Sequence, residues 1–169
     1  PGRAFENIPD SVKREYSKWA KVVGEDVIRF THHYCTGLNW INRYDLTLTA
    51  NYKGVEFDRQ LALKAALSEF KFMRGRLKPK HKLYYMMLMR EAYVYNEQGN
   101  ISAAAKNYKE ILKLKPGYAP SYVEYARLLK SVGNHSDAIK ILQIGLKKTK
   151  GATIIKQALA RVEGTGSEN

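Results

Sequence analysis

The residues with the clearest chemical potential lie close together in the N-terminal third of the chain. His32 and Cys35 are three positions apart, so on a helix both side chains would lie on one face and could share a metal ion. No second cluster of histidines, cysteines or carboxylates supplies the remaining ligands of such a site. A structural role fits better, with His33 or Cys35 packed at a helix contact and His32 hydrogen-bonded to a neighbour. We therefore expect no metal and no other cofactor.

Covalent catalysis through Cys35 also lacks support. An activated thiolate needs a base that points towards it, and a neighbouring histidine on the same helix points elsewhere. Serines and carboxylates show no catalytic spacing, and no glycine-rich phosphate loop occurs. Cys35 is the single cysteine, which excludes an internal disulfide. The sequence therefore predicts a protein that is not an enzyme.

Positive charge is the strongest signal in the composition. The chain has 29 lysines and arginines against 16 acidic residues, a net charge of +13. Such a balance predicts an acidic partner, which could be nucleic acid, an acidic polysaccharide, an anionic membrane surface or an acidic protein. No apolar run approaches the roughly 18 residues that a membrane span needs, so no span is expected.

Many of the cations follow the ends of predicted helices, and together they define a basic edge. Its residues are Lys71, Arg74, Arg76, Lys78, Lys80, Lys82, Lys113, Lys115, Lys147, Lys148 and Lys150, with Lys140 nearby. If the helices stack regularly, these positions line one side of the stack as a positive stripe. A simpler interpretation is a solvated face, because lysines favour helix C-termini through the helix dipole.

A pattern that occurs twice in the sequence predicts the helices on which these cations lie. Gly99 recurs as Gly133 and Ala104 as Ala138, in each case after 34 residues. Ala92 with Ala126 and Asn100 with Asn134 follow the same offset. A repeat of this length is typical of stacked helix–turn–helix units, in which small residues stand where two helices cross closely. Glycine at the turn can end the first helix in the left-handed conformation.

This pattern resembles the tetratricopeptide repeat family. The first unit matches it at Leu88, Ala92, Tyr95, Gly99, Ala104, Tyr108 and Pro116, and the second at Tyr122, Ala126, Leu129, Gly133, Ala138 and Leu142. Lys150 stands where the second unit would have its proline. The resemblance implies an all-α, right-handed α-solenoid with an N-terminal flanking helix and a C-terminal capping helix.

The remaining segments follow from apolar spacing. We expect an extended arm at 1–9 and a degenerate N-terminal region at 10–80, consisting of the flanking helix and one degenerate helix pair. Two repeat units at 81–150, a capping helix at 151–163 and a disordered tail at 164–169 complete the chain. Within the N-terminal region, Asp45–Val55 is polar and predicts a long connection between helices.

In the tetratricopeptide family the first helix of each unit lines a groove that holds a partner segment. By register, the residues expected to face this groove are Met86, Met89, Tyr93, Asn96, Val123, Arg127 and Lys130. Arg127 and Lys130 could hold a carboxylate, and methionine adapts to varied apolar surfaces. The alternative is that the N-terminal helices fill the groove and make Met86 and Met89 part of the core.

The function that the sequence favours is protein–protein interaction. We expect a non-catalytic scaffold or assembly subunit that binds an acidic partner, or its own copies, through the groove and the basic edge. The alternative is a helical repeat protein that binds nucleic acid through the basic edge, with tyrosines stacked on bases.

A second resemblance concerns the compartment. The run His32-His33-Tyr34-Cys35 and the later pair Asn42-Arg43 are similar to a group of bacterial repeat proteins that are often exported, with Trp19 and Gly24 matching upstream. The resemblance implies a periplasmic or extracellular location rather than a cytoplasmic one, and it carries no function with it.

Overall fold

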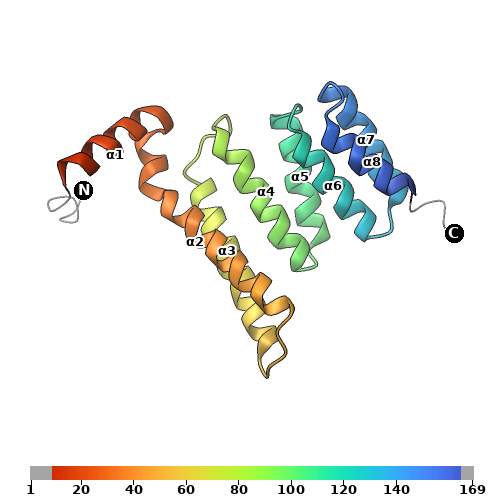
Figure 1. Cartoon of the computed structure of the whole chain (residues 1–169), viewed down its shortest axis with the longest axis horizontal. Coiled ribbons are helices and arrows are strands. Elements are labelled where there is room, and N and C mark those ends of the chain that lie inside the picture. The colour runs from red at the N-terminus through yellow and green to blue at the C-terminus, as the bar shows by residue number, and fades with distance from the viewer. Residues whose placement is uncertain (1–8, 165–169) are drawn as a thin grey trace.

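The computed structural model describes residues 9–164, so the arm and tail expected at the two termini fall almost entirely outside it. Eight helices follow one another in this range, and no strand occurs within it. Their bounds are α1 (Asp10–Val23), α2 (Glu25–Leu48), α3 (Val55–Arg74), α4 (Lys82–Glu97), α5 (Ile101–Leu114), α6 (Ala119–Ser131), α7 (His135–Lys148) and α8 (Thr153–Gly164). The helices form a row of hairpins with α1 and α8 at opposite ends (Figure 1). The all-α solenoid predicted from the repeat is confirmed.

Three apolar clusters run through this row. The first joins α2, α3 and α4 around Phe70 and Met87, the second joins α4, α5 and α6 around Ile111, and the third joins α6, α7 and α8 around Leu142 and Ile155. Each cluster takes side chains from adjacent hairpins. No hairpin buries its apolar face alone, and this dependence on neighbours is what makes repeat proteins stack.

The small residues of the repeat lie at the helix crossings, where the spacing places them. Ala92, Ala104, Ala126 and Ala138 are all buried. Methyl side chains let the helix axes approach closely, and larger side chains such as Tyr108 fill the space around each crossing. The positions that recur in the repeat are therefore those at which the helix packing requires a small side chain.

The turns inside the two units are built in the same way. Gly99 and Gly133 have φ angles of 72° and 79°, a conformation that glycine adopts at little cost. The side chain of Asn100 then accepts a hydrogen bond of 3.1 Å from the Ala103 N–H and caps α5. Asn134 caps α7 in the same manner. The asparagines thus begin the second helix as well as marking the turn.

The exit from the second unit replaces proline with two left-handed residues. Lys150 has a φ of 53° and Gly151 a φ of 80°, and together they end α7. The chain then reverses into α8, whose Ile155 and Val162 are buried against the third cluster. The last helix therefore covers the apolar face that the second unit would otherwise expose.

The N-terminal pair α2–α3 uses a glycine where the later units use alanine. A Cβ atom at Gly37 would lie 2.5 Å from the ring of Phe70, which is completely buried. The two helices cross so closely that only a hydrogen fits at this position. The aromatic ring of α3 occupies the volume that a side chain on α2 would take.

The structure corrects the expected long connection between Asp45 and Val55. Helix α2 continues to Leu48, and the loop contains only residues 49–54. Tyr44 is buried one turn before the end, and Arg59 Nη2 donates a 2.6 Å hydrogen bond to the Thr47 carbonyl oxygen. Leu38, Ile41, Tyr44 and Leu48 keep helical spacing through a segment whose polar residues face solvent. The last turn of α2 was not predicted because the segment is rich in polar residues.

Helix α1 extends from the end of the row without burying any side chain (Figure 1). Gly24, with a φ of 96°, separates it from α2. The ring of His81, in the loop before α4, hydrogen-bonds the carbonyl oxygen of Val23 over 3.2 Å. This contact fixes the C-terminal end of α1 against the body of the protein.

Candidate partner-binding groove

A pocket of about 250 Å³ opens beside α4 and α6, the first helices of the two repeat units. Its lining consists of Met86, Met89, Arg90, Tyr93, Tyr108, Tyr118, Glu124 and Arg127. The α4 contributions follow helical spacing, since Met86, Arg90 and Tyr93 lie four and three positions apart. The opposite face of α4 buries Met87, Leu88 and Glu91 in the core. One face of the helix is therefore fully buried, whereas the other packs only partly against the core and lines the pocket.

Cations and phenols stand around the apolar part of this pocket. Arg90 and Arg127 are exposed, and Arg127 Nη1 donates a 2.8 Å hydrogen bond to Glu124 Oε2. Burial, together with the charges of Glu97 and Asp45, raises the pKa of Tyr93 to about 12. Burial also raises the pKa of Tyr108 above its ordinary value. Both phenols are thus uncharged hydrogen-bond donors at neutral pH, beside two guanidinium groups that can meet a carboxylate.

Four of the seven residues expected in the groove line this pocket: Met86, Met89, Tyr93 and Arg127. Met86 and Met89 are partly buried: Met86 packs against the first apolar cluster and Met89 against the second, and both also line the pocket. The other three lie outside it. Asn96 Nδ2 donates to Glu97, Val123 packs against the third apolar cluster, and Lys130 is partly buried.

Four members of the lining were not predicted from the sequence: Arg90, Tyr108, Tyr118 and Glu124. Arg90 could have been found, because it stands four residues after Met86 on the same helical face. Tyr108 comes from the second helix of the unit, and Tyr118 from the turn before α6, so the position of neither follows from the spacing along the first helices.

Several members of the basic edge are engaged within the protein. Arg74 forms a short ion pair with Glu91, which is 1% exposed. Burial alone would lower the pKa of Arg74, but the hydrogen bond and charge of Glu91 raise it. The guanidinium of Arg76 stacks 3.3 Å from the centre of the Phe72 ring, and the Lys71 ammonium lies 5.2 Å from that of Tyr95. Part of the basic edge therefore serves the fold.

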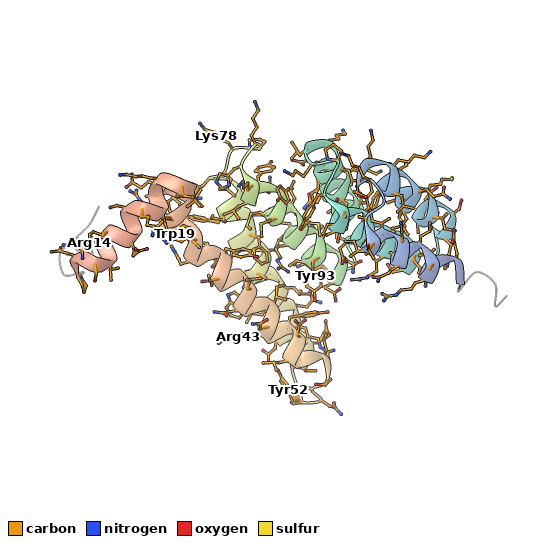
Figure 2. All side chains as sticks on the ribbon, turned by 45° about the horizontal axis from the view of Figure 1, so that its top comes forward. Arg14, Trp19, Arg43, Tyr52, Lys78 and Tyr93 are labelled. Atoms are coloured by element: carbon orange, nitrogen blue, oxygen red, sulfur yellow. The ribbon has the colours of Figure 1, made fainter. Side chains whose placement is uncertain are left out.

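The remaining members of the basic edge reach solvent. They are Lys78, Lys80, Lys82, Lys113, Lys115, Lys147, Lys148 and Lys150, of which Lys115 also lies 5.8 Å from the centre of the Tyr85 ring. Lys78 projects from the loop between α3 and α4 (Figure 2). These lysines lie in the loops that follow α3, α5 and α7 and in the helix ends beside them, and all three loops lie along one edge of the row, opposite the loop between α2 and α3 (Figure 1).

The histidine pair lies at the contact between α2 and α3. His33 Nδ1 makes a short hydrogen bond to Glu69, and its ring packs 3.9 Å from that of Phe72. His32 Nδ1 lies 3.1 Å from the carbonyl oxygen of Arg29, and Cys35 is exposed. Within residues 9–164, no group of three or more His, Cys, Asp or Glu side chains could hold a metal ion.

No helix among the described residues is both long and apolar enough to cross a bilayer.

Comparison with known proteins agrees with this architecture. Residues 95–162 match the tetratricopeptide repeat family. A TPR-containing protein of Dictyostelium discoideum is 30% identical over 79 residues, which is 47% of this chain. The chain spans only about 6% of the length of that relative. With its repeated alanines buried at the helix crossings and its two glycine–asparagine turns, the chain is similar to tetratricopeptide repeat proteins, and the match covers residues 95–162.

Proposed function

We propose that the protein is a non-catalytic scaffold whose pocket beside α4 and α6 binds a partner segment with an acidic group next to an apolar side chain. Tetratricopeptide repeats generally mediate protein–protein interaction. The observation that carries the proposal is the joint presence of Arg90, Arg127, Met86 and Met89 around one open pocket. The arginines meet the carboxylate, and the flexible methionines adapt to the neighbouring side chain.

The methionines also provide the test. Met73 and Met87 are completely buried, whereas Met86 and Met89 line the pocket, so the four methionines of the chain divide into two probes and two internal controls. With 13C-labelled methionine methyl groups, we expect twelve-residue peptides containing an Asp-Phe or Glu-Leu pair to shift the signals of Met86 and Met89 only. The same peptides with Asn or Gln should bind at least about tenfold more weakly, because a hydrogen bond to a charged group is lost.

The matched variants are Arg90→Gln/Arg127→Gln and Lys147→Gln/Lys148→Gln, which remove the same charge from the pocket and from the basic edge. We expect the first to abolish the methionine shifts and the second to leave them unchanged. Equal loss with both variants would reduce the interaction to general electrostatics. Unchanged Met86 and Met89 signals with every acidic peptide would overturn the proposal.

The competing function is nucleic-acid binding through the exposed lysines of the basic edge. For this function, the variant of the basic edge should lose binding and the pocket variant should keep it. Random single-stranded RNA would then bind with a steep salt dependence, Lys147→Gln/Lys148→Gln would weaken it, and the pocket variant would not. We favour the pocket because Arg74 and Arg76 of the basic edge are already committed to Glu91 and Phe72.

The similarity around His32–Cys35 adds a proposal about compartment. We place the protein outside the cytoplasm, in the periplasm or the extracellular space. Fractionation of the source cells, followed by immunodetection of the chain, tests this. Recovery with cytoplasmic markers alone would contradict it.

A further inference from the structure

The N-terminal hairpin α2–α3 projects well beyond its neighbours. Its helices contain 24 and 20 residues, whereas α4 to α7 contain 13 to 16. At 1.5 Å per residue, α2 is about 36 Å long and α6 about 20 Å. The end of the hairpin that carries the loop between α2 and α3 therefore stands clear of the row (Figure 1). We name residues 43–61 the overhang.

The overhang exposes an unusual amount of apolar surface. Its exposed large side chains are Leu46, Leu48, Tyr52, Phe57 and Leu61, of which Leu46 and Phe57 are 75% and 71% exposed. Isolated exposed apolar residues are ordinary, but here five lie within one projecting element, and three of them, Leu46, Tyr52 and Leu61, line the same pocket. Such surfaces in a soluble domain usually mark an interface.

A pocket of about 320 Å³ lies within this surface. Its apolar lining comes from Trp40, Leu46, Tyr52 and Leu61, and Arg43 and Asp58 stand at its two sides, on α2 and α3 respectively. The guanidinium of Arg43 lies 4.7 Å from the centre of the Trp40 ring. Tryptophan, tyrosine and arginine are the residues that most often dominate the energy of protein interfaces.

The net charge of the overhang indicates which kind of partner can bind it. Arg43, Lys53 and Arg59 are balanced by Asp45, Glu56 and Asp58, so this segment contributes nothing to the net charge of +13. Arg43 and Tyr52 lie at the opposite end of the hairpin from Lys78 of the basic edge (Figure 2). Two copies of so basic a chain repel one another, and they can approach most easily through a neutral surface that is far from the lysines.

The two rim charges also suit a two-fold arrangement. In an isologous interface, a contact between two different residues occurs twice because of the two-fold axis. Arg43 of each copy would therefore face Asp58 of the other copy. Tyr52 already donates a hydrogen bond of 2.5 Å to Asp58 Oδ2, which holds this carboxylate in place. We propose that the overhang is a homodimer interface, in which two α2–α3 hairpins pack tip to tip with Arg43 paired to Asp58. This proposal does not depend on what the pocket beside α4 and α6 binds.

Sedimentation over a range of protein concentrations tests the proposal on the full chain. We expect the mass to rise from 19.3 kDa to twice that value as concentration increases. Leu46→Glu should weaken dimerisation at least about tenfold, because it places an unpaired charge in the apolar contact. Leu114→Glu on α5 is the matched control, since Leu114 is also an exposed leucine, and it should leave dimerisation unchanged.

A charge swap gives the sharper result. Asp58→Arg places two arginines opposite one another and should weaken the dimer, and Arg43→Asp/Asp58→Arg should restore it. Far-ultraviolet circular dichroism confirms that each variant is folded. A wild-type chain that stays monomeric at all concentrations, equal weakening by Leu114→Glu, or a double variant no better than Asp58→Arg would each overturn the homodimer.

Discussion

The two regular units, α4 to α7, and the N-terminal pair α2–α3 solve the same packing problem by different means. The regular units use alanines at their crossings, capped second helices and turns of glycine and asparagine. The N-terminal pair uses Gly37 under Phe70, longer helices, and an α3 without a side-chain cap. Both regions therefore need a close crossing between paired helices, but the small residue that permits it and the lengths of the helices differ between them.

The two regions meet at Arg74 of α3 and Glu91 of α4, and separating this pair should have the largest effect. Arg74→Met leaves the buried Glu91 carboxylate without its partner, which we expect to reduce the free energy of unfolding by about 3–5 kcal/mol. Urea unfolding followed by circular dichroism measures this. Hydrogen exchange should show the greatest loss of protection where α3 contacts α4.

Arg127→Met is the control, because its pair with Glu124 is exposed and should contribute less than about 1 kcal/mol. In the double variant Arg74→Met/Glu91→Leu both charges are removed, and most of the lost stability should return. If the double variant were as unstable as Arg74→Met, the buried charge would not be the cause.

The crossing of the N-terminal pair should be the next most sensitive point. In Gly37→Val the new side chain overlaps the Phe70 ring, and we expect the free energy of unfolding to fall by about 1–3 kcal/mol. Because the change lies in the first apolar cluster, amide protection should fall in α2 and α3 and persist in α6 and α7. Mass-spectrometric hydrogen exchange distinguishes the two regions.

Gly117→Val is the matched substitution, since no atom lies within 4 Å of a Cβ built at Gly117. It should change stability much less than Gly37→Val. A uniform loss of protection along the whole row after Gly37→Val would mean that the N-terminal pair and the regular units unfold as one unit, which would contradict a separate contribution of each to stability.

The caps of the regular units should have the smallest effect. Asn100→Ala removes the hydrogen bond to the Ala103 N–H, and we expect a loss of about 1 kcal/mol in the free energy of unfolding, measured by urea titration. Asn42→Ala makes the same exchange at an exposed position inside α2 and should be neutral or slightly stabilising, since alanine favours helices. Equal losses in the two variants would show that Asn100 does not act as a cap.

Much of the fold could be predicted from the sequence, because the signals involved are local. The recurrence of Gly99 as Gly133 and of Ala104 as Ala138 specifies helix ends and close crossings directly. The end of α2 was predicted wrongly because the polar composition after Tyr44 suggested a loop, although the apolar residues there keep helical spacing. The stabilising contact is the buried Tyr44, whose hydroxyl donates to Glu97 of α4, 53 positions away. No local pattern in the sequence predicts a hydrogen bond between residues so far apart.

The lining of the candidate site could be predicted from the sequence only in part. Helical spacing placed Met86, Met89 and Tyr93 on one face of α4, but Tyr108 and Tyr118 join the pocket from a second helix and a turn. Arg74 illustrates the opposite case, since it was assigned to a solvent-facing basic edge and instead pairs with the buried Glu91. Spacing along one helix cannot show which residue of another helix it meets.

A row of helical hairpins with small residues at their crossings could be predicted from the amino-acid sequence alone. Those features depend on backbone conformation and side-chain volume within some 34 residues. Three features required the folded structure: which cations make contacts inside the protein, which side chains share the pocket beside α4 and α6, and how far the overhang projects. Each of these depends on the packing angle between helices, which is set by many distant contacts at once.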